Sequence, residues 1–138
     1  APPPERALIG CCWQVKDDGQ TLYVNEFSWN RISNVLYLES PAGVGYSYSD
    51  NGNYTTSDTE VAEDNYLALQ DFFTKFPNFT KNEFYVIGES YGGIYTPTLS
   101  LRIVTGGTKI NLQVPAGKWV PGVGREWVMR VDYGCGGW

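Results

Sequence analysis

Histidine is absent from this sequence of 138 residues. A serine nucleophile needs a neighbouring base to accept its proton, and histidine is the usual base because its pKa lies near neutral pH. The chain therefore cannot supply the base of a Ser-His-Asp triad by itself. The lack of histidine and of any C-x-x-C pair also argues against a metal site.

Cysteine is scarce and odd in number, with Cys11, Cys12 and Cys135. Neighbouring cysteines rarely bond each other, so the thiols either stay unpaired or have partners outside this chain. A Cys12–Cys135 bridge is the remaining alternative.

Positive charge and long apolar segments are scarce as well. The chain has 10 Lys and Arg against 15 Asp and Glu, a net charge of −5. Because nucleic acid is bound by basic patches, we expect no nucleic-acid partner. No apolar run is long enough to span a membrane, and Ala1–Arg6 shows neither an initiator Met nor an apolar signal core. Either a signal has been removed or the chain is a fragment.

The sequence does contain enough apolar material, 42%, for one globular domain with a modest core. Several segments carry secondary-structure signals. These predict a hairpin (13–15 and 21–24, turning on 17–19), core strands (33–39 and 84–87), helices (57–76 and 92–104) and a further strand start (109–112). The uninterrupted apolar strands suit a mostly parallel sheet covered by helices on both faces, which is an α/β fold.

The clearest helix signal lies in residues 57–76. Ser57 and Glu60 form a capping box, and Pro77 ends the segment. Its apolar residues follow one stripe, namely Val61, Tyr66, Leu69, Phe73 and Phe76. We expect the acidic residues of this helix to form a solvated face.

A strand followed by Gly88-Glu89-Ser90-Tyr91-Gly92 matches the G-x-S-x-G motif. In that motif the serine sits on a strained turn between a strand and a helix, and a Cβ at either glycine would crowd the turn. The pattern is only moderately specific, but the predicted strand before it and helix after it support it. We expect Ser90 to be the nucleophile and the N–H of Tyr91 to form half of an oxyanion hole.

Two N-x-T sequences predict N-glycosylation acceptors, at Asn53 and Asn78. Both lie in segments that we expect to be loops. Two such sites favour passage through the secretory route.

Two longer segments resemble the serine carboxypeptidases, a family of the α/β-hydrolase fold. One is Gly88–Pro97, GESYGGIYTP, and the other runs from Ser28-Trp29-Asn30 through Asn34–Tyr48, NVLYLESPAGVGYSY. The likeness covers about residues 15–112 and is greatest to the lysosomal members. It implies a partial α/β-hydrolase domain in 13–112, incomplete at both ends. Composition predicts an irregular lead in 1–12, which is rich in Pro, and an unmatched, irregular tail in 113–138, which is rich in Gly and has no apolar periodicity.

The resemblance also implies a reaction, and that reaction needs neither a metal nor an organic cofactor. Family members remove the C-terminal amino acid of a peptide through a serine acyl-enzyme, and the Glu before the serine, protonated at acidic pH, helps bind the substrate carboxylate. Glu89 holds that position here; otherwise it is a surface residue at a turn. Relatives place the triad Asp and His far downstream, so we expect this chain alone to be inactive. The loop 39–49 is either a wall of the substrate pocket or a packed connection.

Two other functions stay open under the same resemblance. Lysosomal members also shield lysosomal glycosidases in a complex, which requires a surface and no triad. Related serine carboxypeptidase-like proteins are acyltransferases, which pass the acyl group to an alcohol. The likeness to the lysosomal members implies a lysosomal or secreted location.

Overall fold

The computed structural model describes residues 13–88, 90–113, 116–117 and 127–131. The regular elements follow in chain order. They are β1 (Trp13–Val15), β2 (Leu22–Val24), a 3-10 helix (Trp29–Arg31), β3 (Asn34–Leu36), α1 (Asp58–Lys75), a second 3-10 helix (Pro77–Phe79), β4 (Phe84–Gly88), α2 (Gly92–Thr105), β5 (Ala116–Gly117) and β6 (Trp127–Val131). The lead 1–12, with Cys11 and Cys12, lies outside the described residues, as do Glu89 and Cys135.

The predicted hairpin is confirmed as the antiparallel pair β1–β2, with Gln14 opposite Tyr23. Its turn depends on Asp18, whose carboxylate accepts the N–H groups of Gln20 and Thr21 at 2.9 and 2.8 Å. Gly19 has φ +70°, which a residue with a Cβ rarely adopts. The hydroxyl and N–H of Thr21 together hold the pKa of Asp18 below its usual value.

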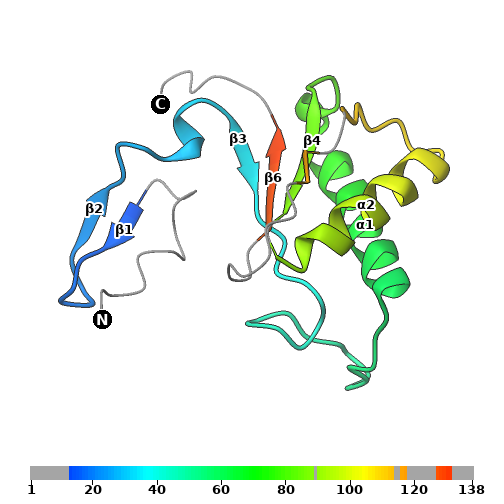
Figure 1. Ribbon diagram of the computed structural model, residues 1–138, viewed down its shortest axis with the longest axis horizontal. Coiled ribbons are helices and arrows are strands. Elements are labelled where there is room, and N and C mark those ends of the chain that lie inside the picture. Colours follow the sequence, from blue (N-terminus) through cyan, green and yellow to red (C-terminus); the bar gives the residue numbers. More distant parts are fainter. Residues whose placement is uncertain (1–12, 89, 114–115, 118–126, 132–138) are drawn as a thin grey trace.

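A four-stranded sheet has the order β3-β6-β4-β5 (Figure 1). The β4–β5 pairing is parallel, whereas β6 runs antiparallel to both of its neighbours. Because β3 and β4 are each antiparallel to β6, they are parallel to one another, and their carboxyl ends lie at the same edge of the sheet. This relationship places the segments that follow β3 and β4 at one edge.

The tail differs from the prediction of an irregular segment in 113–138, because β5 and β6 both come from it. The β6 sequence WVMRV is rich in β-branched and aromatic residues. The backbone N–H and C=O groups along β3 and β4 need partners, and β6 provides them for both strands. The predicted strand at 109–112 is reduced to one parallel bridge between Phe84 and Leu112.

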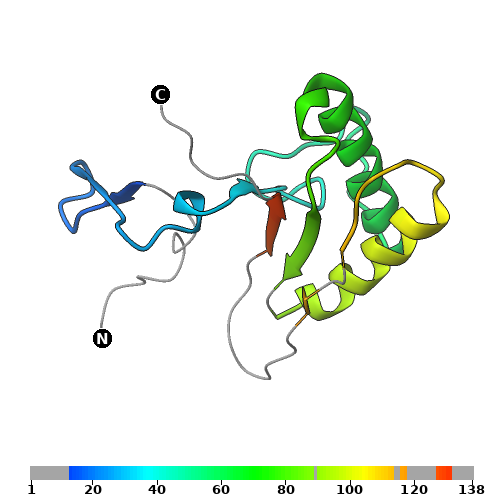
Figure 2. The same ribbon diagram turned by 90° about the horizontal axis from the view of Figure 1, so that it is seen from above.

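Both helices lie on the same side of the sheet, with α2 packed against α1 and β4 (Figures 1 and 2). The predicted helices are confirmed within one or two residues, and the Ser57 hydroxyl accepts the N–H of Glu60 at the start of α1. The core lies between helices and sheet, and seven buried side chains make it up: Tyr66, Leu69, Phe73, Phe84, Val86, Leu99 and Ile103.

The apolar stripe of α1 is buried as predicted, except at its last member. Phe76 is 51% exposed because it follows the last helical residue and has non-helical dihedrals, φ −124° and ψ 64°. The following Pro77 does end the helix, and a 3-10 turn takes over there.

Candidate functional site

Ser90 lies between the end of β4 and the start of α2, and it is half-buried. Its φ is +58°, and it is the non-glycine residue with a positive φ in the described part of the chain. This left-handed conformation costs an L-residue about 1–2 kcal/mol, so it persists only where the surrounding fold imposes it. The serine therefore sits on the strained strand-to-helix turn that the G-x-S-x-G pattern predicts.

The turn is closed by backbone hydrogen bonds that lead directly into α2. The N–H of Gly93 donates to the carbonyl of Ser90, and the N–H of Ile94 donates to that of Tyr91, both at 2.9 Å. Gly92 is buried as the first residue of the helix. Ser90 thus precedes a helix N-terminus, where backbone N–H groups stabilise developing negative charge.

The side chain of Tyr91 ties this turn to the other helix. Its hydroxyl donates to Asp58 Oδ1 at 2.9 Å, and its ring meets that of Tyr95 edge-on at 4.8 Å between centroids. The bond to the carboxylate raises the pKa of Tyr91, because the phenolate would lose that bond and face a second negative charge. Burial, and then the charge of Asp58, raise the pKa of Tyr95.

Sequence reasoning placed the acidic residues of α1 on a solvated face and so missed Asp58. It lies 33 residues before Tyr91 in the chain. No spacing rule links a helix start to a turn at that separation. The contact arises because α1 and α2 pack side by side.

The loop 39–49 follows β3, at the sheet edge where β4 also ends. Its conformation is organised by Glu39, whose carboxylate accepts the N–H of Tyr46 at 2.7 Å and whose carbonyl accepts the hydroxyl of Ser47 at 2.5 Å. Gly45 has φ +55°, and a Cβ there would overlap the Glu39 carboxylate. The loop is therefore specifically built, while Tyr46 at its tip is 96% exposed.

The predicted site residues fall into two places. Gly88, Ser90, Tyr91 and Gly92 lie together at the turn after β4, and Glu89 lies outside the described residues. Asn53 and Asn78 are both exposed and belong to separate segments, one in the loop before α1 and one in the 3-10 helix after it.

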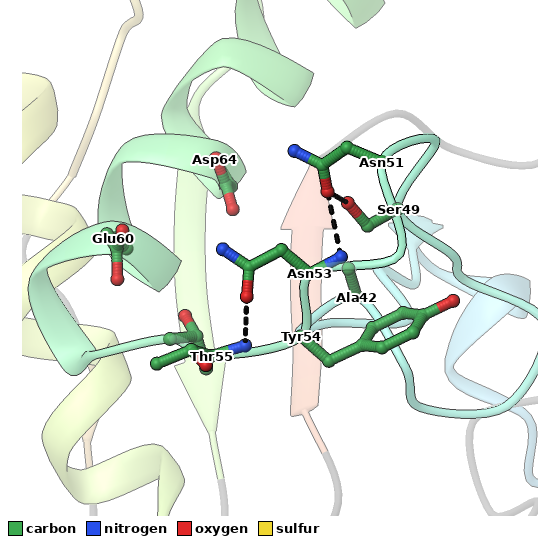
Figure 3. Close-up of a pocket in the computed structure, with 9 residues that line it drawn as sticks. Ala42, Ser49, Asn51, Asn53, Tyr54, Thr55, Glu60 and Asp64 are labelled. Carbon is green, nitrogen blue, oxygen red and sulfur yellow. Dashed lines mark hydrogen bonds between the residues drawn. The ribbon is translucent and has the colours of Figure 1, made fainter.

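A polar cavity of about 190 Å³ lies between the loop that precedes α1 and the first turns of that helix (Figure 3). The loop supplies Ser49, Asn51, Asn53 and neighbouring residues, and α1 supplies Glu60 and Asp64. Within the described ranges, no group of three or more His, Cys, Asp or Glu side chains is arranged to hold a metal ion. Among those same residues no helix is long and apolar enough to cross a bilayer.

Comparison with known proteins identifies the class. The profile of the serine carboxypeptidase family matches residues 9–116, which is most of the chain. The chain therefore belongs to the serine carboxypeptidase family, as the two segments around Ser28–Tyr48 and Gly88–Pro97 indicated.

Individual relatives agree with this assignment. The chain is 56% identical over 92 residues to serine carboxypeptidase ctsa-4.1 of Caenorhabditis elegans, which covers 67% of this chain and 20% of the relative. It is 56% identical over 99 residues to the lysosomal protective protein of Mus musculus (72% and 21%), and 46% identical over 100 residues to serine carboxypeptidase-like 21 of Arabidopsis thaliana (72% and 20%). The chain spans about a fifth of the length of these relatives.

Proposed function

We propose that Ser90 is the nucleophile of a serine carboxypeptidase and that this chain carries the nucleophile turn of that enzyme. The observation that supports the proposal most is the φ of +58° at Ser90, on a turn from strand to helix. A left-handed serine is costly, and such strain is found where it serves a site. The family membership supports an α/β-hydrolase fold, of which residues 13–112 form a part.

In the proposed reaction, the Ser90 Oγ attacks the carbonyl carbon of the last peptide bond of a peptide. The N–H of Tyr91 donates to the oxyanion that forms, with the dipole of α2 adding to the stabilisation. The C-terminal amino acid leaves with a proton from the base, and water then hydrolyses the acyl-enzyme. Glu89, protonated at acidic pH, donates a hydrogen bond to the substrate carboxylate.

The base that accepts the Ser90 proton comes from sequence beyond this chain, since the chain has no histidine. We therefore expect the chain alone to be inactive, and the whole enzyme to act on peptides with a free C-terminal carboxylate. The similarity to a lysosomal relative supports a lysosomal or secreted location.

A fluorophosphonate probe tests the assignment, because it reacts only with an activated serine. The full-length parent should be labelled at Ser90 and should cleave a blocked dipeptide best at acidic pH, whereas the 138-residue chain should be labelled negligibly. Ser90→Ala should abolish labelling of the parent, and Ser49→Ala, which removes a hydroxyl from the loop after β3, should leave it unchanged. Labelling of the parent that survives Ser90→Ala would contradict the proposal.

A second candidate is a non-catalytic role as a binding partner of lysosomal glycosidases. It is favoured by the likeness to a protein named lysosomal protective protein. Co-purification of a glycosidase with the parent, equally for the wild type and Ser90→Ala, would support this role. A third candidate, acyl transfer to an alcohol, predicts an ester product in place of a free acid when the parent is supplied with an alcohol.

A further inference from the structure

The two N-x-T sequences of this chain differ in what their side chains already bind. In the first, the Oδ1 of Asn53 accepts the N–H of Thr55 at 3.0 Å, and among the described residues neither the Asn53 Nδ2 nor the Thr55 hydroxyl has a hydrogen-bond partner. Residues 52–57 form no helix or strand, and Asn53 and Thr55 are exposed. The acceptor nitrogen and the hydroxyl that a glycosylating enzyme must grip are both available.

The side chains and backbone of the second N-x-T sequence already take part in local contacts. Asn78 lies inside the 3-10 helix Pro77–Phe79, and the hydroxyl of Thr80 donates to the carbonyl of Pro77 at 2.7 Å. Between them, Phe79 packs against the core, with its ring 6.0 Å from that of Phe72. In the folded chain, an enzyme could bind this segment only after these contacts break.

The amide nitrogen of Asn53 lies beside the polar cavity (Figure 3). In Figure 3 the Asn53 Nδ2 points away from the loop, toward the side of α1 that carries Glu60 and Asp64. The space of about 190 Å³ is lined mainly by hydrogen-bonding groups. Its two carboxylates accept hydrogen bonds and cannot donate them when ionised, so they suit a neutral ligand rich in hydroxyl and N–H donors. A space of this size suits a single sugar ring.

We propose that Asn53 is N-glycosylated and that the first N-acetylglucosamine occupies this cavity, with its donors on Asp64 and Glu60. The co-reactant is a lipid-linked oligosaccharide diphosphate of the secretory pathway. The Asn53 Nδ2 attacks C1 of the first sugar and loses one proton to a base. The bond from C1 to the phosphate oxygen breaks, and the lipid diphosphate leaves with that electron pair. This modification is independent of the chemistry at Ser90.

The first test asks which asparagine carries the sugar. The 138-residue chain is directed into the secretory pathway of a eukaryotic cell, and its mass is compared before and after peptide N-glycosidase F. One glycan is expected on the wild type and on Asn78→Gln, and none on Asn53→Gln or Thr55→Ala. Asn53 and Thr55 are both exposed, so neither substitution removes a buried side chain on which the contacts around Asn78 depend. An unmodified wild type, or a glycan kept by Asn53→Gln, overturns the assignment.

The second test asks where the sugar lies. Peptide N-glycosidase F must reach the bond between Asn53 and the sugar, so release from the native chain should be slow and should accelerate after denaturation. Asp64→Ala should speed release from the native chain about tenfold, because the sugar loses one hydrogen bond to a carboxylate and such a bond changes an equilibrium by about that factor. Asp71→Ala is the matched control, because it removes an exposed carboxylate of α1 outside the cavity and should leave the rate unchanged. Equal rates for Asp64→Ala and wild type overturn the placement of the sugar.

Discussion

The hydroxyl of Tyr91 donates to the carboxylate of Asp58, with 2.9 Å between the oxygen atoms. The bond joins the residue after Ser90 to the first residue of α1. The start of α1 is thereby held at the candidate site, although the two bonded residues lie 33 positions apart in the chain. A displacement of α1 would therefore move the turn that carries Ser90.

This bond predicts the titration of Tyr91. The pKa of Tyr91 is raised in the folded chain, chiefly by the bond to Asp58. Asp58→Ala removes both the acceptor and the charge, so the pKa should fall toward the usual value of about 10. The tyrosinate absorbance of each chain, with that of its Tyr91→Phe partner subtracted, measures the shift. An unchanged Tyr91 titration in Asp58→Ala would contradict the assigned cause.

The same shift fixes the sign of an effect on stability. Because the pKa of Tyr91 is higher in the folded chain than in the unfolded one, the bond stabilises the fold fully below the unfolded value of about 10. That contribution disappears as the pH rises through the folded pKa. In urea unfolding, Tyr91→Phe should therefore lose stability at neutral pH but approach the wild type under strongly alkaline conditions.

A second prediction concerns the ion pair between Glu63 of α1 and Arg102 of α2. Arg102 binds both carboxylate oxygens, with the Nη2–Oε1 distance at 2.9 Å, and its guanidinium lies 4.2 Å from the centre of the Tyr66 ring. The hydrogen bond from Arg102 lowers the pKa of Glu63. The stability that this carboxylate contributes is therefore present above its unfolded pKa, about 4.3, and is lost as the pH falls through the lower folded value.

Glu63→Gln should accordingly unfold at a lower urea concentration than wild type at pH 7, and the difference should shrink in acid. Asp71→Asn provides the comparison, because its pair with Lys75 lies on the same helix with side chains 60% and 65% exposed. Such exposed pairs contribute little, so its effect should be smaller at every pH. A difference for Glu63→Gln that stays constant down to the acid transition would argue against the pair as its source.

A third prediction follows from the backbone of Ser90. With φ at +58°, glycine should be preferred over alanine there, and Ser90→Gly should be more stable than Ser90→Ala by about 1 kcal/mol. Ser100 gives the opposite case within α2, where it is buried and regularly helical. There the alanine variant should be more stable than the glycine variant by about 1 kcal/mol. Unfolding in urea of the four variants gives both differences, and the same sign at both positions would refute the strained turn.

Local rules predicted the elements that depend on neighbouring residues. The Asp-Gly turn, the cap at Ser57, the stop at Pro77 and the turn between β4 and α2 are all encoded within a few positions. The sequence therefore predicted the position of Ser90 and its strain. Family resemblance supplied the reaction, which no local pattern contains.

Features that depend on distant pairing could not be predicted in this way. The strand β6 lies about 40 residues after β4, and its place between β3 and β4 follows from backbone groups that need partners. The contacts of Asp58 with Tyr91 and of Thr108 with Tyr66, at 2.6 Å, likewise arise from the packing of α1 against the segment around α2. Burial was misjudged at Phe76 because the helix ends one residue earlier than the stripe.

The last prediction tests the core that holds the candidate site in place. Leu69 of α1 is part of the core between the helices and the sheet and is 0% exposed. Leu67, two positions earlier on the same helix, is 51% exposed. Leu69→Ala should lower the free energy of unfolding by about 2–5 kcal/mol, from lost burial and the cavity left behind. Leu67→Ala should change it by no more than about 0.5 kcal/mol, because alanine favours the helix and little contact is lost. Urea unfolding should show this contrast with equal slopes, and similar losses at both positions would mean that α1 does not pack with this face inward.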